Sequence, residues 1–154
     1  MSSVPRTTIS FADAAPRLAA ALGSFQAVAY PGKVDLVTRE LVRILSGRLS
    51  HCSICRNLRL KAAIDRGFDE SMVDQLDDVD HSDLTDAQKI AVRFARAFLT
   101  DPAGFGPGDH AELRRHFDDE QVAELVLDLV RFRPGSKLTV ASGNEPAADE
   151  LVLL

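Results

Sequence analysis

The stretch ELVRILSGRLSHCSIC, residues 40–55, decides the fold, because it joins an amphipathic helix to both cysteines of the chain. From Val34 to about Leu49 the apolar residues recur at three- and four-residue spacing, which is typical of a helix with one face in a core. Glu40 lies next to that apolar stripe. A second helix is expected to begin near Cys52, so the cysteines should lie where two helices meet. The stripe consists of Val34, Val37, Leu41, Ile44, Leu45 and Leu49.

The remainder of the chain also predicts helices, because Val and Ile follow helical spacing and strand alternation is nearly absent. Capping signals and helix breakers give the expected bounds. The fold class predicted from the sequence is therefore all-α. The expected helices run from Ser10 to near Gly23, from near Cys52 to just before Gly67, from Asp69, from the capping box Thr85–Gln88 to Pro102, and from the capping box Asp118–Gln121.

Three segments are expected to interrupt or follow these helices. The run DPAGFGPGD, residues 101–109, predicts a long loop. Pro134 and Gly135 should kink or break the last helix, because proline lacks the N–H of the helical hydrogen bond. The final residues, NEPAADELVLL (144–154), resemble a tail whose apolar end could dock on a neighbour.

Composition predicts a single domain over residues 1–154. The chain is 45% hydrophobic and 27% charged, which is usual for a globular domain of this length. No stretch approaches the roughly 18 apolar residues of a membrane span, and MSSVPRTTIS at the start lacks the apolar segment of a signal peptide. We therefore expect a soluble cytoplasmic protein with no membrane partner.

Charge is distributed unevenly. Residues 1–60 hold eight Lys/Arg and three Asp/Glu, whereas residues 61–154 hold ten and twenty. The basic excess lies near the cysteines, but the net charge of −5 and the few aromatic residues argue against a nucleic-acid partner.

Cys52 and Cys55 allow three interpretations. A structural zinc site needs four ligands, and the chain has no second cysteine or histidine pair at suitable spacing, so we expect no metal. Two buried, unreactive cysteines remain an alternative. The redox interpretation is favoured because both sulfurs would lie in the first turn of a helix, where free N–H groups stabilise a thiolate. Arg56, Arg59 and His51 would add positive charge nearby.

A redox cycle at this pair needs no cofactor in the protein. One sulfur is oxidised to sulfenic acid, the other captures it as a disulfide, and an external dithiol reduces that disulfide. Three-residue spacing favours a strained disulfide that exchanges easily. A thioredoxin-like fold would need β-strands around the motif, which the sequence does not supply.

This sequence resembles the alkylhydroperoxidase AhpD family, which consists of helical redox proteins and is part of the carboxymuconolactone decarboxylase-like superfamily. The resemblance covers about residues 30–143. It rests on Glu40 twelve residues before Cys52, on the Cys-x-x-Cys pair, and on three downstream segments: LTDAQKIAVRFARAFLTDP (84–102), ELRRHFDDEQVAELVLDLVRF (112–132) and KLTVASG (137–143).

The resemblance implies an AhpD-like helical bundle subunit that assembles into a homo-oligomer. It also implies an antioxidant peroxidase that a dithiol partner of protein or lipoyl type reduces. Cys55 matches the cysteine that attacks peroxide, Cys52 its more exposed partner that meets the reductant, and Glu40 the acid of a proton relay. Position at the helix start instead favours Cys52 as the more acidic thiol, so the order of attack stays open.

The chain departs from the family pattern at two positions. Arg59 stands where the family has a histidine, and Ile54 replaces the histidine between the cysteines. Arginine keeps its proton, so Arg59 cannot act as a base, although it could hold a thiolate or pair with Glu40. The alternative to a catalytic Glu40 is an ion pair with Arg43 or Arg59 on a helix surface. His51 is then the histidine nearest to the thiols in the sequence. Arg59→His is expected to raise a peroxidase rate.

Two other functions remain possible from the sequence. The chain could act without redox chemistry on a small organic acid, as the lactone decarboxylases of the superfamily do. It could also be a helical interaction module that catalyses nothing. The sequence does not identify the oxidant, the reductant or the oligomer number.

Overall fold

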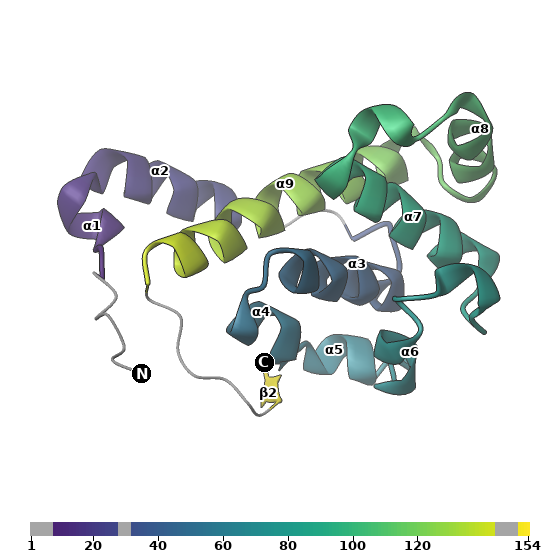
Figure 1. Ribbon diagram of the computed structural model, residues 1–154, viewed down its shortest axis with the longest axis horizontal. Helices are drawn as coiled ribbons and strands as arrows, with labels where there is room; N and C mark the ends of the chain where they lie inside the picture. Colours follow the sequence, from purple (N-terminus) through teal and green to yellow (C-terminus); the bar gives the residue numbers. More distant parts are fainter. Residues whose placement is uncertain (1–7, 28–31, 144–150) are drawn as a thin grey trace, which may run out of the picture.

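The computed structural model describes residues 8–27, 32–143 and 151–154 and is almost entirely helical. Helices pack around a central one, α3, Leu36–Leu49 (Figure 1). Asp35 caps α3, because its side chain accepts a hydrogen bond from the N–H of Thr38 at 2.9 Å. The all-α prediction is confirmed. No helix in the described ranges has the length and apolar character needed to cross a membrane.

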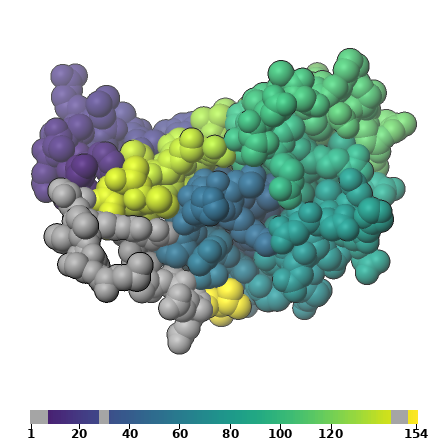
Figure 2. Space-filling view, viewed as in Figure 1, coloured from purple at the N-terminus to yellow at the C-terminus, as the bar shows by residue number. Residues whose placement is uncertain are grey.

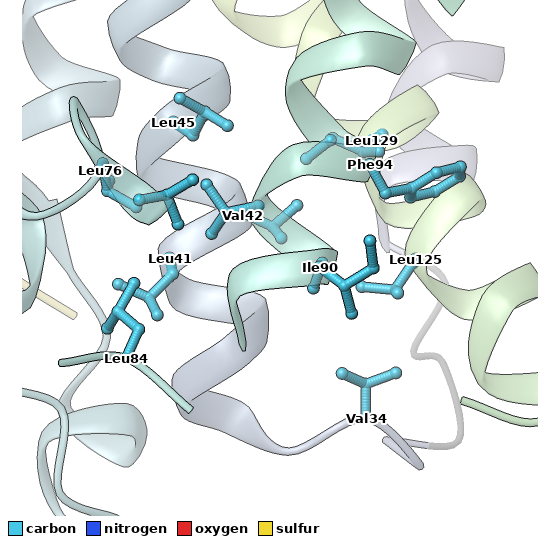
Figure 3. Packing of buried hydrophobic residues seen from close by; sticks show 14 of the residues in the cluster. Val34, Leu41, Val42, Leu45, Leu76, Leu84, Ile90, Phe94, Leu125 and Leu129 are labelled. Atoms are coloured by element: carbon cyan, nitrogen blue, oxygen red, sulfur yellow. The ribbon is translucent and has the colours of Figure 1, made fainter. Parts of the chain in front are cut away.

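The core lies between α3, α7 (Asp86–Thr100) and α9 (Asp119–Ala141). The apolar face of α3 points toward the other two helices, as its spacing predicted (Figure 3). This packing fixes α3, and with it the chain that leads into the cysteines. The residues labelled in Figure 3 are Val34, Leu41, Val42, Leu45, Leu76, Leu84, Ile90, Phe94, Leu125 and Leu129.

Two buried carboxylates on α9 also hold the start of α3. Asp128 accepts two hydrogen bonds from the guanidinium of Arg39, at 2.7 and 3.1 Å. Glu124 accepts from the backbone N–H groups of Lys33 and Val34, at 2.8 and 3.1 Å. Burial of these acids is tolerated because each finds partners that compensate for its lost water.

The N-terminal segment forms α1 (Phe11–Ala14) and α2 (Pro16–Ala27), and α2 lies beside the C-terminal half of α9 (Figure 1). Ser10 caps α1 through the N–H of Asp13, as predicted. The helix is interrupted at Ala15, because a residue before proline avoids the helical conformation. It then continues past Gly23, so the expected end at that glycine is wrong.

The helix expected between Cys52 and Gly67 is two short helices. α4 spans Ser53–Asn57 and α5 spans Lys61–Ile64, with the short strand β1 (Leu58–Arg59) between them. Gly67 adopts a φ of 98°, the left-handed conformation expected at that position. The chain continues through α6 (Ser71–Asp74) and the 3₁₀ turn η1 (Val79–His81).

Both predicted capping boxes are present. Thr85 and Gln88 open α7, and Asp118 and Gln121 open α9. The loop predicted at 101–109 is shorter than expected, because the 3₁₀ turn η2 (Pro102–Gly104) and the start of α8 (Pro107–His116) lie in it. Pro107 suits the first turn of a helix, where its missing N–H is not needed.

Helix α9 runs without a break through Pro134 and Gly135, so the predicted break is wrong. Helix α9 packs against α3 and α7, and this packing compensates for one missing hydrogen bond. Gly135 has a packing role here. A Cβ at this position would lie 3.1 Å from Nε2 of Gln26, so the glycine lets α2 approach α9 closely.

The end of the chain pairs with its own fold. Strand β2 (Val152–Leu153) pairs in parallel with β1, with Leu58 opposite Val152 and Arg59 opposite Leu153. Figure 1 shows β2 beside α4 and α5. This pairing places the last four residues next to the segment that carries the cysteines.

Candidate active site

A sharp turn between α3 and α4 positions the two cysteines. His51 adopts a φ of 53°, a left-handed conformation that is uncommon for a residue other than glycine. The turn lets the N–H of Cys52 donate to the carbonyl of Gly47 at 3.1 Å. Cys52 then caps α4, which begins one residue later, as the sequence approximately predicted.

Gly47 allows α4 to lie directly against α3. A Cβ at this position would lie 2.8 Å from the carbonyl carbon of Cys55 and 2.9 Å from the N of Arg56. Both atoms belong to the backbone and cannot rotate away. The position of Cys55 therefore depends on the absence of a side chain on the facing turn of α3.

Cys52 and Cys55 form a disulfide. The N–H of Cys55 also donates to Sγ of Cys52 at 3.3 Å, a contact that favours negative charge on that sulfur after reduction. Helix α4 has only five residues, so its dipole adds little to this local hydrogen bond.

The two sulfurs differ in exposure. Cys52 is 0% exposed, whereas Cys55 is half-buried. The expectation that Cys52 is the more exposed cysteine is therefore wrong for the subunit. The physical reason is the turn at His51, which directs Cys52 back toward Gly47 of α3, while Cys55 lies at the edge of an adjoining pocket.

Cys55 lines a pocket of about 490 Å³ between α2, α4, the C-terminal half of α9 and the end of the chain. The lining is mostly apolar, with two guanidinium groups, one amide and one hydroxyl. Cys52 is not part of this lining. The pocket residues are Gln26, Arg43, Ile54, Cys55, Leu58, Arg131, Phe132, Gly135, Ser136 and Leu154.

Arg43 connects this pocket to the interior of the fold. Its Nη1 donates to the carbonyl of Cys55 at 3.1 Å, and its Nη2 donates to the carbonyl of Leu58 at 2.5 Å. The guanidinium also forms a bidentate pair with Glu40, at 2.8 and 2.7 Å. Arg43 therefore fixes the C-terminal half of α4 and the residue after it, while it contributes positive charge to the pocket wall.

Glu40 is 0% exposed. Its ion pair therefore lies in the interior of the subunit, and the expected position on a helix surface is wrong. Its partner is Arg43, and its Oε1 also accepts the N–H of Leu60 at 3.0 Å. Because arginine keeps its proton, Arg43 cannot relay one from Glu40 to the pocket. In this arrangement Glu40 orients and compensates Arg43.

Arg59 pairs with Glu70 and not with Glu40, so that possibility from the sequence is wrong. Arg59 is buried, it donates to the carbonyls of Arg56 and Leu58, and it does not line the pocket. Its extended position in β1 turns the side chain toward α6. Arg59→His would therefore remove this ion pair before it could test proton transfer at the thiols.

His51 is exposed and lies outside the pocket lining. In the described ranges, no three histidine, cysteine or acidic side chains gather as metal ligands would. The charged group that the structure brings to Cys55 is Arg43, which the sequence indicated only as a possible partner of Glu40. The available signal was its position three residues after Glu40, on the same face of α3.

No protein-family model matches the chain. An uncharacterized protein of Mycobacterium tuberculosis, from strains CDC 1551 and H37Rv, is 34% identical over 122 residues, which are 79% of this chain and 43% of that protein. The chain thus spans less than half the length of these relatives. The uncharacterized protein YdfG of Bacillus subtilis is 22% identical over 142 residues, 91% of this chain and 97% of YdfG.

Two solved structures share the fold. One is a protein of unknown function from Agrobacterium tumefaciens described as a candidate antioxidant defence protein AhpD, with a TM-score of 0.73, 15% identity and coverage of 92% of this chain and 99% of that one. The other is the debrominase Bmp8, with a TM-score of 0.66, 20% identity and coverage of 88% and 75%. A variant of Bmp8 with one cysteine replaced by alanine is also solved with 2,3,4-tribromopyrrole. This chain therefore has the AhpD-like helical fold.

Proposed function

We propose that this chain is a thiol redox enzyme that cycles Cys52 and Cys55 between dithiol and disulfide. It takes two electrons from a dithiol reductant and uses them to reduce a small-molecule peroxide. The observation that supports this best is the placement of the pair. Cys55 lines a pocket large enough for a small organic molecule, and Cys52 is bonded to it from the buried side.

The oxidative half-reaction begins at Cys55. Its thiolate attacks one peroxide oxygen, the O–O bond breaks, and the alkoxide leaves and takes a proton from water. Cys55 is then a sulfenic acid. The thiolate of Cys52 attacks this sulfur, hydroxide leaves and is protonated, and the disulfide forms. Each turnover converts one peroxide into an alcohol and water.

The reductive half-reaction also takes place at Cys55 in this proposal. A thiolate of the reductant attacks the sulfur of Cys55, because Cys52 is buried. Cys52 leaves as a thiolate that the N–H of Cys55 stabilises. The second thiol of the reductant then attacks the mixed disulfide and releases Cys55. This assigns the reductant to Cys55, where the family resemblance implied Cys52.

Arg43 supports this chemistry by charge and position rather than by proton transfer. Its guanidinium holds α4 through the carbonyls of Cys55 and Leu58 and presents positive charge to the pocket. A positive wall favours a thiolate at Cys55 and an anionic oxygen that develops beside it. Glu40 keeps the guanidinium in place.

Reductive dehalogenation is a second candidate, and the apolar pocket wall favours it. The debrominase Bmp8 has the same fold, and Ile54, Leu58 and Phe132 offer apolar contacts to a halogenated ring. In such a reaction the thiolate of Cys55 would accept the bromine from carbon, the ring carbon would take a proton, and Cys52 would displace bromide as the disulfide forms. The two electrons again come from the dithiol.

Thiol counting tests the proposal. Reduced protein should lose two free thiols per subunit with one equivalent of cumene hydroperoxide and regain them with dihydrolipoamide. Cys55→Ser should abolish turnover, and Cys52→Ser should stop the cycle at the sulfenic acid. Bromide release from 2,3,4-tribromopyrrole, with the same two variants, distinguishes the second candidate.

The other functions give different results in this experiment. Unchanged thiols after peroxide and after tribromopyrrole would contradict both redox proposals and leave a helical interaction module. Activity on a small organic acid that survives both Cys→Ser substitutions would instead support the non-redox alternative.

A further inference from the structure

Leu154, at the end of the segment 151–154, forms part of the wall beside Cys55. The N–H of Leu154 donates to the carbonyl of Arg59 at 2.9 Å, and the N–H of Lys61 donates to the carbonyl of Leu154 at 2.8 Å. Figure 2 shows residues 151–154, in yellow, against the surface that the α3–α5 region forms. They therefore continue the β1 edge toward the pocket.

Strand geometry divides this segment into two faces. Successive side chains of a strand point to opposite sides, so Leu153 and Leu154 face different surroundings. Leu154 lines the pocket together with Cys55 and Leu58, whereas Leu153 is not part of the lining. Both remain well exposed, at 64% and 69%. Leu154 thus lies between the pocket and solvent.

The attachment of this segment is weak compared with that of the helices. The described contacts of residues 151–154 are made with β1 and the first residue of α5, and none of these four side chains belongs to the buried core. The short β1–β2 pairing, the two backbone hydrogen bonds of Leu154 and partly exposed leucines hold this segment, and segments attached in this way open locally at low free energy.

We propose that residues 151–154 form a movable wall of the Cys55 pocket and that Leu154 is a specificity-determining residue. With the wall in place, slender molecules reach the sulfur of Cys55, and the bulky surface of a folded thiol protein does not. This proposal rests on the redox function proposed above. Both the oxidant and the reductant that reach Cys55 are then small molecules.

The test is the rate at which the Cys52–Cys55 disulfide is reduced, followed by mass spectrometry. Two probes are compared: dithiothreitol, which is slender, and thioredoxin, a folded dithiol protein. A chain ending at residue 150 should show about a tenfold higher ratio of the thioredoxin rate to the dithiothreitol rate, which corresponds to about 1.4 kcal/mol. Leu154→Ser should raise the ratio in the same direction.

Leu153→Ser is the matched control, because it changes a neighbouring leucine that does not line the pocket. Its ratio of the thioredoxin rate to the dithiothreitol rate should stay within about twofold of the ratio for the original chain. Circular dichroism should show equal helix content for all four chains, since residues 151–154 lie outside the helices.

An unchanged ratio in the shortened chain would overturn the movable wall and leave the redox function intact. An equal rise with Leu153→Ser would show that Leu154 has no special role. A disulfide that dithiothreitol does not reduce in any of these chains would contradict the redox function itself, and the wall with it.

Discussion

At the scale of single residues, the difference in exposure between Cys52 and Cys55 should determine which of the two thiols reacts first. Alkylating agents react with thiolates that they can reach, so burial protects one sulfur and leaves the other open. In reduced protein, iodoacetamide should modify Cys55 at least about tenfold faster than Cys52, a ratio equivalent to about 1.4 kcal/mol. Peptide mass spectrometry at short reaction times measures both rates. Equal rates would contradict the assignment of Cys55 as the attacking sulfur.

The Glu40–Arg43 pair gives a second prediction for single residues. Arg43→Gln leaves a fully buried carboxylate without its cation, which should lower the free energy of unfolding by about 3–5 kcal/mol. The double variant Glu40→Gln with Arg43→Gln should recover part of this loss, and urea unfolding measures it. Lys61→Gln is the control, because the exposed Lys61–Asp65 pair should contribute less than about 1 kcal/mol. A neutral Arg43→Gln would contradict the structural role of the pair.

The sequence could identify the main residues of the site, but not which side chains pair with one another in the fold. The Cys-x-x-Cys pair and Glu40 stand out because their spacing is local and chemically distinctive. The partner of Glu40 was not decided, because Arg43 and Arg59 were both candidates until the fold turned Arg59 toward Glu70. The exposure of Cys52 depended on the backbone conformation of His51, and no local pattern predicts a left-handed histidine.

Among the elements, the close approach of α3 and α4 decides where Cys55 lies. Gly47→Ala would place a methyl group against the backbone of Cys55 and Arg56, so one of the two helices must shift. We expect a loss of about 1–3 kcal/mol in the free energy of unfolding and a changed rate of disulfide reduction. Urea unfolding and reduction by dithiothreitol measure the two effects.

Gly23→Ala is the matched control for this prediction. Gly23 also lies within a helix, but a Cβ there would meet no atom within 4 Å. Alanine should therefore be neutral or stabilise the fold by about 0.5–1 kcal/mol. A Gly47→Ala protein that behaves like Gly23→Ala would show that the approach of the two helices is not tight.

The η1 turn carries a pH-dependent contact. A hydrogen bond and the charge of Asp78 raise the pKa of His81 above its ordinary value of 6.5. A raised pKa in the folded protein stabilises it below the unfolded pKa, and this contribution is lost as the pH rises through the folded pKa. His81→Asn should thus lower the melting temperature slightly at pH 5.5 and not at pH 8.5. Equal effects at both pH values would contradict this origin.

Helix starts were predicted better than helix interruptions. Ser10, Thr85 and Asp118 each cap a helix as their side chains suggested, because a cap is a local contact. The continuity of α9 through Pro134 depends on packing against α3 and α7, which outweighs the local effect of proline. The division of the helix after Cys52 follows from the pairing of β1 with a strand almost a hundred residues later.

For the whole molecule, the family resemblance predicts a homo-oligomer, and α9 offers a surface for it. Leu127 and Val130 lie on its outer face and are 40% and 39% exposed. Nearby, Nη1 of Arg133 is buried with no hydrogen-bond partner in the described ranges. Exposed apolar side chains such as Leu127 and Val130 favour contact with another subunit.

Light scattering should therefore give a mass that is a multiple of 16.7 kDa. Val130→Asp should shift this mass toward one subunit, because a charge in an apolar interface is unfavourable. Leu18→Asp on α2 is a control at an exposed leucine. A mass of one subunit for the original chain would contradict the predicted assembly.

The guanidinium of Arg43 also bears on acid tolerance. An imidazole at the pocket would gain a proton between about pH 5 and 8, so a site built on it would change character during mild acidification. A guanidinium does not change charge in that range, and Glu40 holds the one of Arg43 in place through two hydrogen bonds. A drop in ambient pH should then affect the reaction through the sulfurs themselves.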